Sequence, residues 1–126
     1  MLRPFNPEGL AASPAYSHGV EATASQRMVF VSGQIGMRAD GSIAEGMAAQ
    51  TELAIANIIT VLADAGLGAG DIAKLTIFLT DETLLDEFRA ARRAALPGTP
   101  PASSLVFVKA LIRPELLVEI EAIAVR

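Results

Sequence analysis

The sequence contains no cysteine, no tryptophan and a single histidine, His18. The absence of cysteine excludes disulfides, thiolate metal sites and a cysteine nucleophile. One histidine argues against a histidine-based zinc site and against a Ser-His-Asp triad. We therefore expect no metal site, and any chemistry has to come from carboxylates, hydroxyls and the backbone.

Long apolar runs and an excess of positive charge are also missing. No run reaches the roughly 18 apolar residues that a membrane helix needs, and the N-terminus lacks the pattern of a signal peptide. These absences predict a cytoplasmic protein that does not enter a membrane. The net charge is −4, with 14 acidic and 10 basic residues. Because nucleic-acid binding normally requires a basic patch, this balance argues against nucleic acid as the main partner.

What the chain does have is an apolar surplus. Its 126 residues are the size of one domain, and 52% of them are hydrophobic. The mean hydropathy of +0.43 is high for a small protein. There is no internal repeat, linker or low-complexity segment, so we expect one domain over residues 1–126. A chain this short and apolar is expected to bury part of its surface against copies of itself.

Periodicity and turn residues divide the chain into elements. Residues 1–14 are expected to be irregular because Pro4, Pro7 and Pro14 interrupt them. Strands are predicted at 16–22, 28–32, 71–80, 104–111 and 116–125, and helices at 44–65 and 82–96. The first two strands are expected to pair as a hairpin.

The sequence also predicts which residues cap the two helices and which side chains lie away from their buried sides. Ser42 and Glu45 have the spacing of a capping box before the first helix, and Gln50 is expected to lie away from its buried stripe. The second helix is expected to be capped by Thr80 or Asp81. Its arginines at 89, 92 and 93 are expected to be solvated or paired with acids of the same helix.

The final strand carries the most informative pattern. Its even positions, from Val118 to Ala124, form a wholly apolar face, whereas Glu119 and Glu121 share the other face with large apolar residues. A carboxylate among apolar groups has to be paired, hydrogen-bonded or protonated. Two readings follow: an exposed strand end or structural ion pair, or an acid/base group in a pocket.

The resulting order is β-β-α-β-α-β-β, an α+β sandwich. Two helices can cover only one face of such a sheet, yet the strands are apolar on both. We therefore expect other subunits to bury the second face, which carries Glu119 and Glu121.

Several short motifs, in order along residues 14–126, resemble the RidA (YjgF-like) family of reactive-intermediate deaminases. The matching words are Tyr16 with Gly19-Val20, Val31-Ser32-Gly33-Gln34-Ile35-Gly36, Gln50 and Asn57, Ala65-Gly66-Leu67, Asp71-Ile72-Ala73-Lys74, Phe78 with Asp81, Pro101-Ala102-Ser103-Ser104, and Glu119-Ile120-Glu121-Ala122-Ile123-Ala124.

The resemblance implies a chorismate-mutase-like fold and a homotrimer whose sheets form a central barrel, with small-molecule clefts between subunits. It implies hydrolysis of enamines and imines derived from amino acids to 2-oxo acids and ammonia, without a cofactor. Within that reading Tyr16 lines the cleft, and Ser32 and the backbone around Gly33 bind the ligand. Glu121 positions and activates the attacking water.

One departure concerns the substrate carboxylate. Deaminases that the sequence resembles carry an arginine near the end of the penultimate strand, and an ungapped match from Pro101 places Ala110 there. Lys109 and Arg113 are the nearby candidates to replace it, although neither is an equivalent of a bidentate arginine.

Three functions therefore stay open. The first is an enamine/imine hydrolase with an atypical substrate, and the second is a non-catalytic trimer that binds a small ligand. The third, an endoribonuclease or translation inhibitor, is disfavoured by the acidic charge and the single histidine. His18 is left out of the catalytic set.

Overall fold

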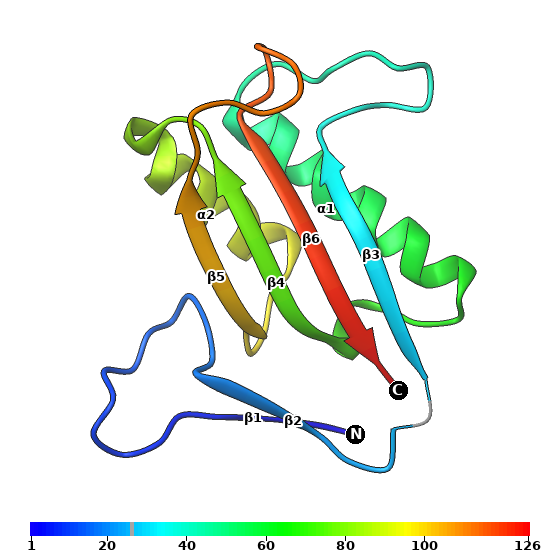
Figure 1. The fold of residues 1–126 in the computed structure, drawn as a ribbon, viewed down its shortest axis with the longest axis vertical. Helices are drawn as coiled ribbons and strands as arrows, with labels where there is room; N and C mark the ends of the chain where they lie inside the picture. The colour runs from blue at the N-terminus through cyan, green and yellow to red at the C-terminus, as the bar shows by residue number, and fades with distance from the viewer. Residues whose placement is uncertain (26) are drawn as a thin grey trace.

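A computed structural model, which describes residues 1–25 and 27–126, shows two helices behind a four-stranded sheet and a separate two-stranded ribbon (Figure 1). The helices are α1 (Met47–Asp64) and α2 (Leu85–Ala95). The strands are β1 (Leu2–Phe5), β2 (Gly19–Ala22), β3 (Met28–Ile35), β4 (Ile72–Leu79), β5 (Ala102–Phe107) and β6 (Val118–Val125). Short 3₁₀ turns, η1 (Ala69–Asp71) and η2 (Glu82–Leu84), precede β4 and α2. No helix in these ranges is long and apolar enough to cross a membrane.

The main sheet has the order β3-β6-β4-β5. The central strand β6 runs antiparallel to both β3 and β4, and β4 and β5 are parallel because α2 provides the crossover between them. The last strand of the chain therefore lies inside the sheet, and β3 and β5 are its two edges. The predicted α+β class, with both helices on one face, is confirmed.

The core lies between that face and the helices. Val118, Ile120 and Ala122 on β6 are at most 3% exposed, and Ile58 and Leu62 on α1 are 0% exposed. The period of two in the strand and the period of 3.6 in the helix bring these side chains together.

The opposite face of the sheet is open in the single chain. Phe30 is 69% exposed, Met28 is 59% exposed and Val106 is 46% exposed. The helices thus leave an apolar sheet face uncovered, as the alternating pattern predicted. We call this surface the open face; it carries Met28, Phe30 and Ser32 of β3, Lys74, Thr76 and Phe78 of β4, Val106 of β5 and Glu119, Glu121 and Ile123 of β6.

Two predictions near the N-terminus were wrong. Residues 2–5 are not irregular, because β1 pairs antiparallel with β2, and Pro4 is tolerated in this narrow ribbon. The expected hairpin between residues 16–22 and 28–32 is absent, since β3 pairs with β6. The long β6 offers β3 a partner within the sheet, and this outweighs closeness in sequence.

The helix starts also differ from expectation. Gly46 occupies the N-cap of α1 without a side-chain bond, whereas Ser42 bonds to Asp40 in the preceding loop. Asp81 does cap, accepting a 2.9 Å bond from the Thr83 amide. The bond from the Thr83 hydroxyl (2.6 Å), followed by that from the amide, lowers the pKa of Asp81 below its usual value. However, Asp81 caps the 3₁₀ turn η2, after which α2 starts.

Gln50 was expected to lie away from the buried stripe of α1, but it is only 2% exposed. Its amide nitrogen donates to the carbonyls of Ala44 (3.1 Å) and Glu115 (2.9 Å), and its oxygen accepts from the Leu117 amide (2.8 Å). The side chain therefore ties the loop before β6 to the helix. Gln50 is buried because its amide satisfies backbone polar groups of two loops that would otherwise lack hydrogen-bond partners.

Gln50→Leu should consequently lower the free energy of unfolding by about 2–4 kcal/mol, because it leaves three backbone groups unsatisfied. Urea titration at one protein concentration measures this. The exposed Thr60→Ala on the same helix is the control, expected within about 0.5 kcal/mol of wild type. Equal stability of Gln50→Leu and wild type would contradict the role of the amide.

Candidate functional site

Ser32 and Glu121 line one pocket of about 260 Å³ on the open face. The register of β3 against β6 shifts between Val31 and Gln34, so that Ser32 and Gly33 lie in a bulge. Bulges redirect side chains, and here the hydroxyl of Ser32 reaches the same pocket as the carboxylate from the next strand. The two residues are thus brought together by one chain.

Lys74 and Thr76 of β4 complete the polar lining of this pocket. Thr76 is the cross-strand partner of Glu121, and the ammonium of Lys74 donates a 3.1 Å bond to the Ser104 hydroxyl. Within the described ranges Lys74 and Glu121 form no ion pair at 4.0 Å or less. We call this set the Glu121 pocket. It pairs an exposed carboxylate with a hydroxyl and a nearby cation, which suits proton transfer on a polar ligand.

Glu119 lies two residues earlier on the same face, against Gly33. A Cβ atom built on Gly33 would lie 2.5 Å from Oε2 of Glu119, so a larger residue there would displace this carboxylate. Glu119 is half-buried, whereas Glu121 is exposed. The strand therefore presents two carboxylates, one in the pocket with Ser32 and one against the backbone of Gly33.

Tyr16 lies on the other side of the sheet. The adjacent Ser17 donates a 2.7 Å bond to the carbonyl of Pro100, and its amide donates to Pro101 at 3.1 Å. These bonds anchor the segment at the start of β5. The Tyr16 ring contacts His18 edge-on, with ring centroids 5.2 Å apart. In one chain, Tyr16 is thus separated from the Glu121 pocket by the sheet.

Lys109 and Arg113 lie in the loop between β5 and β6, and neither lines the Glu121 pocket. Arg113 forms an ion pair with Glu115 at 2.6 Å. Lys109 is exposed and, within the part of the chain that the structure describes, has no ion pair. The single chain does not bring either cation to Ser32 or Glu121.

Arg92 was expected to be solvated or paired with an acid of its helix, and this was wrong. It is 6% exposed, and no ion pair involving it occurs among the described residues. It lies four residues after Phe88, which places it on the apolar face of α2. The four-residue spacing from Phe88 could have indicated that Arg92 is buried, but a charged side chain is usually expected to be exposed.

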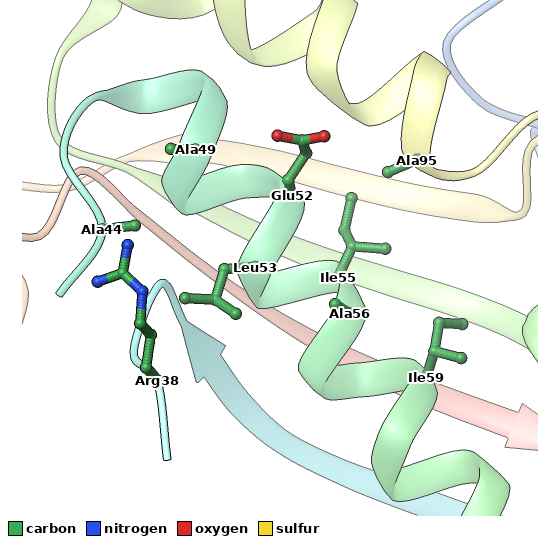
Figure 2. A pocket seen from close by; sticks show the side chains of 9 residues that line it. All are labelled: Arg38, Ala44, Ala49, Glu52, Leu53, Ile55, Ala56, Ile59 and Ala95. Atoms are coloured by element: carbon green, nitrogen blue, oxygen red, sulfur yellow. The ribbon is translucent and has the colours of Figure 1, made fainter. Parts of the chain in front are cut away.

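A wider hollow of about 560 Å³ lies beside α1 (Figure 2). Small and aliphatic side chains, including Ala49, Leu53 and Ile59, line most of it. Figure 2 shows its two charged residues, Arg38 and Glu52, well apart from one another. It brings together no cluster of reactive groups. Groups of three or more potential metal ligands are also absent from residues 1–25 and 27–126.

Comparison with known proteins identifies the family. A profile described as Endoribonuclease L-PSP matches residues 7–126. The chain is 37% identical over 120 residues to the 2-iminobutanoate/2-iminopropanoate deaminase of Salmonella typhimurium, covering 92% of this chain and 91% of that relative. The chain belongs to the RidA (YjgF-like) family. Another RidA-type relative, "Putative reactive intermediate deaminase TdcF" of Escherichia coli, is 37% identical over 106 residues, 79% of each chain.

Solved structures agree with this membership. A Rid-family protein of Yersinia pestis, YyfB, superimposes with a TM-score of 0.88 at 33% identity, over 99% of this chain and 98% of that one. The Escherichia coli TdcF structure with bound serine gives a TM-score of 0.73 at 34% identity, over 96% and 93%. The RidA fold is therefore established for this chain, and one similar protein holds a small amino acid.

Proposed function

We propose that this RidA-family chain is an enamine/imine deaminase that releases ammonia and a carbonyl product from reactive imino intermediates. The observation that carries the proposal is the Glu121 pocket, where a carboxylate and the Ser32 hydroxyl from neighbouring strands face one space. The relatives named as deaminases give the reaction class. A non-catalytic ligand-binding role is the alternative, because a fold alone does not decide function.

The chemistry requires little beyond placement and proton transfer. Water adds to the electrophilic imine carbon while Glu121 accepts a proton from it, and the carboxyl group returns this proton to the nitrogen, giving a neutral carbinolamine. Glu121 then moves the proton of the new hydroxyl group to the nitrogen as the C–N bond breaks, which leaves the carbonyl product and ammonia. Ser32 and the backbone at Gly33 hold the substrate. General acid/base help of this kind is worth about 10² to 10⁴ in rate, and no cofactor enters any step.

Glu119 is a second candidate for the same proton transfer. Its carboxylate is half-buried and packed against Gly33, the backbone position assigned to ligand binding. We keep Glu121 as the proposed acid/base group, and variants of the two residues separate the assignments.

We further propose that three copies cover the open face. An apolar surface that includes Phe30 at 69% and Val106 at 46% exposure is costly to leave in water. Closing three identical sheets into a barrel would bury it and would turn the exposed Glu121 pocket into a cleft near a subunit boundary. A chamber of this kind would limit water around the reacting carbon.

Ammonia release from a panel of imines tests the proposed function. An amino-acid oxidase generates 2-iminobutanoate and 2-iminopropanoate in the cuvette, and the hydrolysis rate is compared with and without the protein. We expect acceleration that is proportional to protein concentration, on these or on imines lacking a carboxylate. Binding of 2-oxo acids without acceleration on any imine would favour the non-catalytic alternative.

The endoribonuclease function in the name of the family profile is the weakest reading for this chain. The net charge of −4 offers little attraction to a phosphate backbone.

The location of the protein in the cell stays a prediction. The sequence predicts the cytoplasm, although one relative, 34% identical, is a mitochondrial protein of Schizosaccharomyces pombe.

A further inference from the structure

One cation shares the Glu121 pocket with the proposed acid/base group. Lys74 lies on β4, on the open face, and its side chain is half-buried. Among the residues that the structure describes, it is the only positively charged one that lines this pocket. The proposed reaction gives roles to Glu121, Ser32 and Gly33 and none to Lys74. Its ammonium group is therefore available to a part of the substrate that these residues do not hold.

Strand register places Lys74 diagonally opposite Glu121. Thr76 of β4 is the direct cross-strand partner of Glu121, and Lys74 precedes Thr76 by two residues on the same face. Diagonal neighbours of this kind lie about 7–8 Å apart. Over the described ranges of the chain, however, the two charges form no ion pair at 4.0 Å or less. They border one pocket without neutralising each other directly.

The ammonium group of Lys74 points toward β5. It donates a 3.1 Å hydrogen bond to the hydroxyl of Ser104, which is the cross-strand partner of Thr76 on the open face. A lysine ammonium has three N–H donors, and this bond uses one of them. Ser104 accepts the bond and keeps its own O–H to donate. An anion beside Lys74 would thus meet both a charged donor and a hydroxyl donor.

The neighbouring side chains form a polar band across the open face. Each strand of the main sheet contributes one polar side chain at the same level, in the order Ser32, Glu121, Thr76 and Ser104. At the next level, Phe30 pairs with Ile123, and Ile123 pairs with Lys74. A polar band beside an apolar wall suits a short molecule with one charged end and one aliphatic end.

The charge of Glu121 itself makes a cation necessary if the substrate is an acid. In a 2-imino acid the carboxylate is bonded directly to the carbon that water attacks. Bringing that carbon to Glu121 therefore brings two negative charges within a few ångströms of each other, and they repel. A cation beside the carboxylate of the substrate offsets this repulsion, and Lys74 is placed to supply it.

We propose that Lys74, together with the Ser104 hydroxyl, binds the carboxylate of the substrate and makes the Glu121 pocket selective for short 2-imino acids. This inference rests on the proposed deaminase function. It assigns the carboxylate grip to a residue of β4, inside the pocket, instead of Lys109 or Arg113, which do not line it.

The position of β6 between β3 and β4 fixes how such a substrate lies (Figure 1). Its carboxylate lies on the β4 side, and its imine carbon lies over β6 between Glu121 and Ser32. Its aliphatic side chain packs on Phe30 and Ile123. The pocket volume of about 260 Å³ limits the substrate to a few carbon atoms.

Binding of 2-oxobutanoate, a product that keeps the carboxylate, measures the grip without turnover. By isothermal titration calorimetry we expect Lys74→Met to weaken binding at least about tenfold, because a hydrogen bond to a charged group is lost. Lys109→Met and Arg113→Met should stay within about twofold of wild type, because both residues lie outside the pocket. Absence of binding to wild type, or a loss confined to Lys109→Met or Arg113→Met, would overturn the assignment.

A neutral ligand separates recognition of charge from a structural effect. 2-Oxobutanamide has nearly the shape of 2-oxobutanoate, and wild type should bind it at least about tenfold more weakly. Lys74→Met should bind the acid no more tightly than the amide, since the cation that distinguishes them is gone. If Lys74→Met loses the wild-type mass in light scattering, Lys74→Gln replaces it, and the same result is expected. A neutral variant that still prefers the acid tenfold contradicts the proposal.

Turnover separates this inference from the deaminase function. With 2-iminobutanoate, Lys74→Met should raise KM at least about tenfold and lower kcat less than Glu121→Gln does, because it removes binding and not proton transfer. Turnover by wild type that Lys74→Met leaves unchanged in both constants overturns the Lys74 assignment alone. Binding of 2-oxobutanoate that depends on Lys74, without turnover of any imine by wild type, refutes the deaminase function alone.

Discussion

Replacing Glu121 by glutamine is expected to lower the rate of imine hydrolysis by at least about 100-fold, because the amide can neither accept a proton from water nor return one to nitrogen. The substitution keeps the size of the side chain and removes only its charge. Since Glu121 is exposed in the single chain and makes no ion pair among the described residues, its loss should leave folding intact. Ammonia release under saturating imine measures the effect on kcat.

Two further variants show whether the loss of rate is specific to Glu121. Glu45→Gln, in the loop before α1, removes an exposed charge away from the open face and should leave the rate within twofold of wild type. Glu119→Gln tests the carboxylate packed on Gly33. A full rate in Glu121→Gln together with a collapse in Glu119→Gln would transfer the acid/base role to Glu119. Full rates in both would exclude the strand β6 carboxylates from the mechanism.

Phe30→Glu is expected to convert the assembled protein into monomers at micromolar concentration. Phe30 is 69% exposed in the single chain, on the face that we propose is covered by copies. A carboxylate buried there without a partner would cost several kcal/mol at each boundary, enough to raise the dissociation constant by more than about 100-fold. Light scattering coupled to size-exclusion chromatography gives the mass.

Ala63→Glu, on an exposed position of α1, is the control with the same added charge on the helix side, and it should keep the wild-type mass. The Phe30→Glu monomer should also lose imine hydrolysis, because the cleft would lack its second wall. A trimeric Phe30→Glu, or a wild-type protein that is itself a monomer, would remove the basis for a site between copies.

The sheet and its open face could be predicted because a period of two is a direct consequence of strand geometry. The alternation of Val118, Ile120 and Ala122 with Glu119 and Glu121 identified both the buried face and the open one before any coordinates. By contrast, the ribbon of β1 and β2 and the pairing of β3 with β6 depend on partners distant in sequence. Local turn signals favour hairpins and contain no information on such partners.

The candidate site was predictable to a different extent for each residue. Ser32 and Glu121 were named through the family resemblance, and the bulge of β3 and the register of β6 place them in one pocket. Tyr16 has the same origin, yet it lies across the sheet, which no motif could reveal. Arg92 was missed because charged residues on short helices are usually solvated. Its spacing from Phe88 was informative, but only the folded structure shows that it is buried without an ion pair among the described residues.

The most direct test of the account is the rate of ammonia release from 2-iminobutanoate by the wild-type protein, measured on a sample whose mass is determined in the same buffer. The account predicts a trimer that accelerates hydrolysis well above the spontaneous rate, with activity lost when the trimer is dissociated. A trimer that binds 2-oxobutanoate but hydrolyses no imine, or a monomer with full activity, would contradict it.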